Sequence, residues 1–276
     1  MTPLALIIVV AIGLSAVMAL AWLVALRTGK SGFIDAIWSF AVGGAGVAAA
    51  LLPVEGTAPV PERQYLVAAL AAAWSLRLGL HIVWRTIGGG DDPRYAHFRK
   101  EWGDGFPRRL FWFLQIQALS AFLLAIAIFA AARNPQPGLG FGDWLGLAMM
   151  VAAVLGEGLA DRQLTRFRSD PRNRGKVCDD GLWAYSRHPN YFFEWLGWLA
   201  YVAIAIDPGG GYPWGFAALV APVFMYWLLV HVSGIPPLEA HMLRSRPEAF
   251  RAYQARVNAF WPGPRRPDPQ SKRIKS

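Results

Sequence analysis

The chain has few of the charged residues that keep a soluble protein in water and almost none of the cysteine that stabilises small secreted domains. Charged residues make up 16% of its 276 positions, whereas 55% are hydrophobic; soluble domains usually carry about 25% charged residues. The single cysteine, Cys178, excludes an internal disulfide and any metal site built from several cysteines. This composition indicates an integral membrane protein.

Several sequence segments common in other proteins are also missing. The start, Met1-Thr2-Pro3, lacks the basic residues of a cleaved signal peptide, so we expect the first apolar run to be retained as a span. The chain shows no long linker and no convincing internal repeat. We therefore predict one domain over residues 1–262, followed by a disordered tail, 263–276, that is rich in proline, lysine and arginine.

Long apolar runs recur along the chain, and a membrane-spanning helix needs about 20 such residues. The runs lie at residues 3–26, 33–52, 65–84, 110–131, 144–161, 190–206 and 213–233. They predict an all-α, polytopic membrane protein with about seven transmembrane helices.

The basic residues predict how these helices are oriented, because lysine and arginine accumulate in cytoplasmic loops. They gather at residues 27–30, 85–109 and 162–187, after the first, third and fifth runs, whereas the even-numbered loops contain only Arg63 and Arg133. We expect the N-terminus outside and the C-terminus in the cytoplasm. The net charge of +9 then belongs largely to one membrane face. We expect membrane lipids and no nucleic acid as partners, while the oligomeric state stays open.

The segment 182–195 brings polar side chains into an apolar run. Pro189 suits the first turn of a helix, and Asn190 and Glu194, four residues apart, then share one helical face. A charge at the centre of a membrane costs about 2.5–3.5 kcal/mol. Glu194 is therefore expected to face a polar cavity lined by protein, with Arg187 and His188 at its mouth.

A basic loop over residues 161–176 precedes this segment. Arginine suits phosphate because its planar guanidinium donates two hydrogen bonds at once, although a cytoplasmic loop can be basic without any ligand. Glu157 and Asp161 share one helical face at the start of this loop. Their carboxylates either accept hydrogen bonds from ribose hydroxyls or an amide, or pair with neighbouring arginines.

Residues 234–262 have the pattern of an amphipathic cytoplasmic helix. Such a helix either lies on the bilayer surface or closes over a cofactor. In the second case Glu239, with Arg251 or Tyr253, is expected to contact that cofactor.

The first half of the chain also places polar groups in apolar runs. Asp35 can form a structural salt bridge with Arg77 and His81, or the three side chains can orient a polar group on an otherwise apolar substrate. Asp91-Asp92-Pro93 favours a turn over a metal site, and we expect no bound metal.

The C-terminal half, residues 156–262, resembles the steroid 5α-reductase C-terminal domain, and the whole chain resembles bacterial membrane proteins of unassigned substrate that carry it. The resemblance rests on Asp161 with Arg166 and Arg168, residues 181–186, Asn190 with Glu194, and residues 258–262. It implies a seven-helix fold that holds NADPH on its cytoplasmic side, with Asp161, Arg168, Asn190 and Glu194 in contact. The reductases' substrate-polarising Gln-Glu pair has no clear counterpart; Asp35 and Trp38 stand there instead.

The element Arg187-His188-Pro189-x-Tyr191 is similar to one in the integral membrane methyltransferases that act on isoprenylcysteine or phospholipid head groups. Their cofactor, S-adenosylmethionine, carries no phosphate, so the basic loop favours the reductase. A non-enzymatic lipid-binding or transport protein is the third alternative.

The resulting expectation is an NADPH-dependent reductase of a carbon–carbon double bond in a steroid- or enone-type lipid, acting at the cytoplasmic face of a bacterial inner membrane. Arg77, His81 or Tyr185 would stabilise charge on the substrate carbonyl, with Asp35 tuning them. The residues expected to bind the cofactor are Glu157, Asp161, Arg166, Arg168, Tyr185, Arg187, His188, Asn190, Glu194, Glu239, Arg251 and Tyr253.

Overall fold

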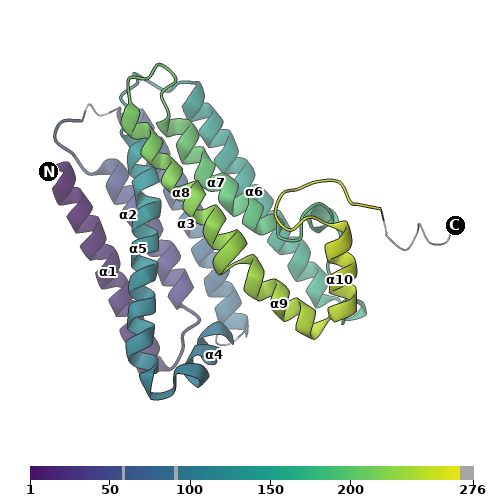
Figure 1. The fold of residues 1–276 in the computed structure, drawn as a ribbon. Helices are drawn as coiled ribbons and strands as arrows, with labels where there is room; N and C mark the ends of the chain where they lie inside the picture. The colour runs from purple at the N-terminus through teal and green to yellow at the C-terminus, as the bar shows by residue number, and fades with distance from the viewer. Residues whose placement is uncertain (58–59, 90–92, 268–276) are drawn as a thin grey trace. The chain divides into compact units, whose positions relative to one another are not determined.

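The computed structural model describes residues 1–57, 60–89 and 93–267, and the regular secondary structure of this part of the chain is helical, without a strand (Figure 1). The prediction of an all-α fold is confirmed. The helices are α1 (Pro3–Thr28), α2 (Ile34–Leu51), α3 (Pro61–Gly89), α4 (Pro93–Trp102), α5 (Phe106–Ala132), α6 (Phe141–Ser169), α7 (Pro189–Ala205), α8 (Val220–Trp227), α9 (Ile235–Ser245) and α10 (Pro247–Arg256).

Six helical segments within the described residues are long and apolar enough to cross a membrane, as expected of a polytopic membrane protein. They cover Pro3–Thr28, Ile34–Leu51, Pro61–Gly88, Arg94–Ala132, Phe141–Ser169 and Pro213–Ser245. The predicted run 190–206 coincides with α7, which has 17 residues, at the short end of spanning helices. The count of seven and the orientation in the membrane stay predictions.

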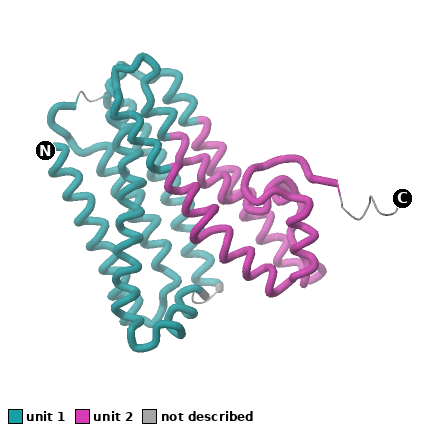
Figure 2. The backbone as a smooth tube through the Cα atoms, in the orientation of Figure 1, with its two compact units in different colours: residues 1–147, 201–221 teal, residues 148–200, 222–276 magenta. Residues whose placement is uncertain are grey.

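The chain divides into two compact units, coloured separately in Figure 2. Unit 1 comprises residues 1–147 and 201–221, and unit 2 comprises residues 148–200 and 222–276, of which the structure describes those up to 267. The boundaries fall within α6, α7 and α8. The single domain over 1–262 stays a prediction, and the two units are described one at a time.

Proline and capping residues set many of the helix ends. Prolines occupy the first position of α1, α3, α4, α7 and α10, where the missing backbone N–H costs no hydrogen bond. Thr2 caps α1 by accepting a hydrogen bond of 3.1 Å from the backbone N of Ala5. Gly29 ends α1 with φ of 68°, a left-handed conformation that glycine adopts without strain.

Small residues let the helices of unit 1 approach closely. A Cβ on Gly43 of α2 would lie 2.2 Å from the Ser75 side chain of α3, and one on Gly46 would lie 2.5 Å from Ile128 of α5. Ser75 Oγ also donates a hydrogen bond of 2.9 Å to the Ser39 carbonyl. Between apolar helices this close van der Waals packing takes the place of the hydrophobic effect.

Arg63 and Arg133, the two basic residues of the even-numbered loops, are both buried within unit 1. Arg63 pairs with Asp143 through Nε–Oδ1 and Nη2–Oδ2 contacts of 2.7 and 2.8 Å. Arg133 Nη2 donates to the carbonyls of Ala49 and Leu52 at the end of α2. Both cations therefore have structural partners inside unit 1.

In unit 2, α6 and α7 run antiparallel in close contact. A Cβ on Gly156 would lie 2.4 Å from the Phe193 ring, and Gly197 lies against Ala153 and Met150. Asn190 Nδ2 lies 3.5 Å from Asp161 Oδ1 in the same register. This register places Glu157 level with Glu194, and both carboxyl side chains are buried.

The predicted amphipathic helix over residues 234–262 is two helices, α9 and α10, because Pro247 begins a new helix after Arg246. A π-helical turn, Leu228–Val232, precedes α9. After α10 the chain returns to α7 and α8, where Phe260 and Trp261 join the rings of Phe192, Trp195 and Tyr226, with centroids 5.0 to 6.2 Å away. This aromatic cluster holds the C-terminal segment in place.

The beginning of the predicted disordered tail is anchored by backbone hydrogen bonds. The N of Gly263 donates to the Tyr185 carbonyl at 3.0 Å, and the N of Arg266 donates to the Arg256 carbonyl at 2.9 Å. Residues 268–276, the rest of that tail, lie outside the described residues.

Candidate functional site: a cationic cavity in unit 2

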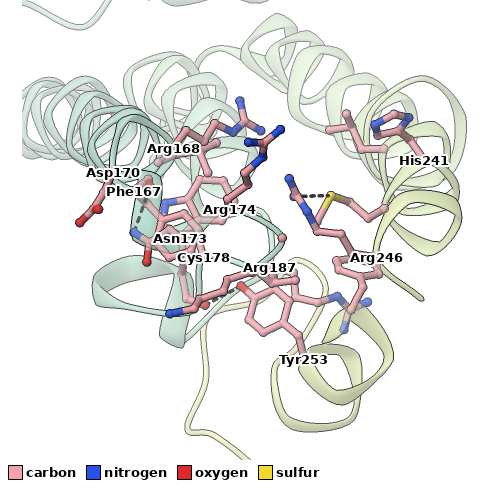
Figure 3. A pocket seen from close by; sticks show the side chains of 18 of the residues that line it. Phe167, Arg168, Asp170, Asn173, Arg174, Cys178, Arg187, His241, Arg246 and Tyr253 are labelled. Atoms are coloured by element: carbon pink, nitrogen blue, oxygen red, sulfur yellow. Dashed lines mark hydrogen bonds between the residues drawn. The ribbon is translucent and has the colours of Figure 1, made fainter. Parts of the chain in front are cut away.

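Unit 2 contains a cavity of about 530 Å³, a size typical of small-molecule sites. One wall is the end of α6 with the loop that follows it, residues 164–178. The other walls are the start of α7 and the helices α9 and α10. Figure 3 shows Arg168 and Arg174 on one side of the cavity and His241 and Arg246 on the other.

The cavity lining is strongly basic. Five cationic side chains line it: Arg168, Arg174, Lys176, Arg187 and Arg246. Its one acidic lining residue, Asp170, is bound by Arg172 at 2.7 Å, and this hydrogen bonding holds the pKa of the Asp170 carboxyl below its ordinary value. The charge of Asp170 is therefore engaged by an arginine that, among the described residues, is not part of the lining.

The five cations differ in how they are engaged. The Arg187 guanidinium binds Glu239, whereas within residues 148–267 neither Arg174, Lys176 nor Arg246 forms an ion pair. Arg246 Nη1 lies 3.8 Å from the sulfur of Met242. These three side chains can thus bind an anionic ligand without first breaking a salt bridge.

Aromatic side chains supply the apolar part of the lining. Phe167, Trp183, Phe250 and Tyr253 border the cavity. Trp183 and Tyr253 are fixed by hydrogen bonds, since Trp183 Nε1 donates to the Ala160 carbonyl at 3.0 Å and Tyr253 Oη donates to the Trp183 carbonyl at 2.6 Å. Such rigid rings can contact the flat face of an aromatic ligand group.

Glu239 on α9 is the centre of the main polar network. Its carboxylate accepts hydrogen bonds from Arg187 at 2.7 and 3.1 Å and from Gln254 at 2.7 Å, and His188 Nε2 lies 3.1 Å from Oε1. Arg187 Nη1 also donates to the Val257 carbonyl at 2.6 Å. The network joins the start of α7 to both α9 and α10.

The structure brings some of the predicted cofactor residues together at this cavity. Arg168, Arg187, His188, Asn190 and Tyr253 line it. Asp161 lies beside Asn190, and Arg166 lines a smaller cavity of about 300 Å³.

The remaining predicted residues of unit 2 are, within the described range, not part of the larger cavity's lining. Glu157 and Glu194 are buried between α6 and α7, where Trp198 Nε1 donates to Glu194 at 2.9 Å. Tyr185 is 55% exposed, and Arg251 is exposed on α10. Glu239 binds Arg187 and contacts His188, and both of these residues line the cavity.

Sequence reasoning did not select Arg174, Lys176 or Arg246 as site residues. The first two belong to the same basic loop as Arg168, and charge alone could not separate lining residues from the others. Arg246 follows Ser245, the last residue of α9, and lines the cavity at the break before Pro247.

Unit 1 contains a second polar cluster, around Asp35 of α2. Its carboxylate forms an ion pair with Arg94 and accepts a hydrogen bond from Tyr95 Oη at 3.0 Å. Tyr95 is buried, and Gln117 Nε2 lies 3.5 Å from its hydroxyl. Sequence reasoning missed Tyr95, although it follows the Asp-Asp-Pro turn signal.

Arg77 and His81, predicted to act with Asp35, lie on α3 in unit 1. Their role at a substrate carbonyl stays a prediction. Asp91 and Asp92 lie outside the described residues, and Pro93 begins α4.

We predict that the thiol of Cys178, which lines both cavities, reacts slowly with alkylating reagents at pH 7.5. Burial raises its pKa above the ordinary value, so the reactive thiolate becomes populated only at higher pH in the folded protein than in the unfolded chain. Iodoacetamide labelling from pH 7 to 10, before and after unfolding in SDS, measures this difference. Identical pH profiles for the two states would contradict it.

Comparison with known proteins supplies a family but no activity. No solved structure matches the chain. An uncharacterized protein of Schizosaccharomyces pombe is 27% identical over 228 residues, which cover 73% of this chain and 64% of that protein; the chain thus spans less than two thirds of this relative's length. A family model described as protein of unknown function (DUF1295) matches residues 21–257. The chain therefore belongs to the DUF1295 family.

Proposed function

We propose that this protein is an NADPH-dependent reductase of a carbon–carbon double bond in a lipid-like substrate, with the cofactor bound in the cavity of unit 2. The observation that carries the proposal is the basic lining of that cavity, in which Arg174, Lys176 and Arg246 have no ion-pair partner among the described residues. The resemblance to the steroid 5α-reductase C-terminal domain supplies the reaction class.

The charge of the cavity suits NADPH better than NADH, which lacks the 2′-phosphate. The pyrophosphate carries about two negative charges, and a phosphate monoester adds about 1.5 to 2 more at pH 7. Arg174, Lys176 and Arg246, with Arg168 beside them, provide matching positive charge from two walls. Guanidinium groups bind phosphate through paired hydrogen bonds, which adds direction to the attraction.

The uncharged lining residues fit the rest of the cofactor. Asn190 can hydrogen-bond a carboxamide, because its side chain combines donors and an acceptor at the cavity wall. Phe167 and Trp183 offer flat faces for a ring system. The residues present therefore fit both the charge and the aromatic parts of NADPH.

NADPH would supply the hydride, and the protein's residues would bind, orient and keep water away from the reacting groups. Tyr185, Arg77 and His81 remain the proposed donors to the substrate carbonyl. From the distribution of basic residues, we place this site at the cytoplasmic face of a bacterial inner membrane, with the substrate entering from the bilayer.

We expect NADPH to raise the melting temperature of the detergent-purified protein, because a ligand that binds only the folded state stabilises it. NADH should give a smaller shift, since it lacks the 2′-phosphate. The measurement is a thermal-shift titration with NADPH, NADH and S-adenosylmethionine in parallel, followed by a screen of enone lipids for NADPH oxidation.

The titration separates the alternatives. Stabilisation by S-adenosylmethionine alone would reject the reductase in favour of a membrane methyltransferase. The absence of any shift would favour a non-enzymatic lipid-binding or transport protein.

A further inference from the structure

Helices α9 and α10 form an arm, residues 235–256, that supplies a whole side of the cavity. The arm contributes Leu238, His241, Met242, Arg246, Phe250 and Tyr253. The opposite wall comes from the end of α6 and the loop after it, and it includes Arg168, Arg174 and Lys176. A ligand that contacts both walls needs the arm at a fixed position.

The arm does not continue α8 as a regular helix. The π-helical turn Leu228–Val232 comes first, and Gly234 follows with φ of −90° and ψ of −92°. A Cβ on Gly234 would lie 2.3 Å from the Leu229 carbonyl oxygen, so the turn requires glycine. Irregular turns of this kind often mark functional positions in helices. Because the helix is interrupted here, side-chain contacts made by the arm itself must fix its position.

Glu239 provides the main polar contacts of that kind. Its two oxygens accept from Arg187 and Gln254, with His188 at 3.1 Å, so one carboxylate binds α7 and α10 at once. The side chains of Arg187 and Glu239 are 12% and 13% exposed. Glu239 itself is not among the residues, all within 148–267, that line the cavity.

We infer that Glu239 is a positioning residue: it fixes the α9–α10 arm against the start of α7 and thereby sets the two cationic walls of the cavity at the separation that the ligand needs. For the identity of that ligand the inference rests on the proposed function. The role differs from direct cofactor contact, because Glu239 acts through Arg187, His188 and Gln254.

The charge of Glu239 is essential to this role. A glutamine at this position would leave the Arg187 guanidinium without its carboxylate partner and would turn an N–H group towards other donors. Hydrogen bonds to charged groups are the strongest of the polar contacts that hold such segments. The arm should therefore open more often in Glu239→Gln, although the aromatic cluster around Phe260 and Trp261 keeps the rest of unit 2 folded.

The test compares Glu239→Gln with Glu248→Gln, a change at an exposed glutamate of the same arm. Cys178 labelling by iodoacetamide reports opening of the cavity, and calorimetry reports the affinities for NADPH and for inorganic pyrophosphate. In Glu239→Gln we expect labelling to become several-fold faster and NADPH to bind roughly ten- to a hundredfold more weakly. The affinity for pyrophosphate should fall less, because pyrophosphate can bind residues 168–176 without the arm. General unfolding would instead lower the affinities for NADPH and pyrophosphate equally.

Unchanged Cys178 labelling and unchanged NADPH affinity in Glu239→Gln would overturn the positioning role. If the wild-type protein fails to bind NADPH but labelling still accelerates in Glu239→Gln, the reductase proposal fails and the positioning role stands. Should Glu239→Gln not fold, Gln254→Leu removes one contact to the carboxylate at 2.7 Å and leaves the Arg187 pair intact. Faster labelling there supports the inference, and labelling at the wild-type rate contradicts it.

Discussion

Replacing Arg63 by methionine is expected to lower the free energy of unfolding by about 3–5 kcal/mol, because it leaves a buried carboxylate without its partner. The Arg63 and Asp143 side chains are 1% and 4% exposed. Each N–H of the guanidinium is used: Nε and Nη2 bind Asp143, and the other contacts go to the carbonyls of Asn134, Gln136 and Gly138 at 2.6 to 2.7 Å. The arginine thus holds the connection between α5 and α6.

The effect can be measured by SDS or thermal unfolding in detergent, with Glu62→Gln as the control at an exposed neighbouring position. A double mutant with Asp143→Leu should be less destabilised than the sum of the two single changes, since no charge is then left buried alone. Additive single effects would show that the pair is not coupled.

Arg174→Ala and Arg246→Ala are each expected to weaken NADPH binding about ten- to a hundredfold, and together about 10² to 10⁴-fold. The two side chains approach the cavity from different walls, and neither has an ion-pair partner within the described part of unit 2. Removing them lowers the positive charge that compensates the phosphates. NADH, which lacks one phosphate, should lose less affinity, so the preference for NADPH should shrink.

Calorimetric titration with both nucleotides, repeated at increasing salt, tests this charge argument. The control is Arg162→Ala, because Arg162 lies in the same basic segment and is exposed but is not part of the cavity lining in the described residues. We expect the control to keep its NADPH affinity and the two cavity variants to show weaker salt dependence than the wild-type protein. Equal losses in all three variants would refute a specific role for Arg174 and Arg246.

Local sequence patterns were sufficient to predict the all-α class and most of the long helices. The apolar runs and Pro189 at the start of α7 are local features of the sequence, and the all-α prediction followed from the apolar runs. The segment 234–262 was less predictable. Its apolar periodicity continues past Arg246, and the prediction of one helix gave no weight to Pro247, which begins α10.

The polar residues show where such patterns reach their limit. The family resemblance predicted that Asp161 and Asn190 belong to one site, and Asn190 Nδ2 lies 3.5 Å from Asp161 Oδ1. Glu239 and Asp35 were named as well, but their partners were not foreseen: Glu239 binds Arg187, His188 and Gln254, and Asp35 binds Arg94 and Tyr95. These contacts join residues as many as 60 positions apart.

Hydropathy and net charge are properties of short segments, so the amino-acid sequence was enough to predict a helical membrane protein with a basic loop beside a polar helix start. Which cations stay available in the cavity, and which are engaged in salt bridges as Arg63 and Arg187 are, depends on how distant helices pack. The physical reason is that a side chain's charge is fixed by its chemistry, whereas its partner is fixed by the three-dimensional packing of distant helices.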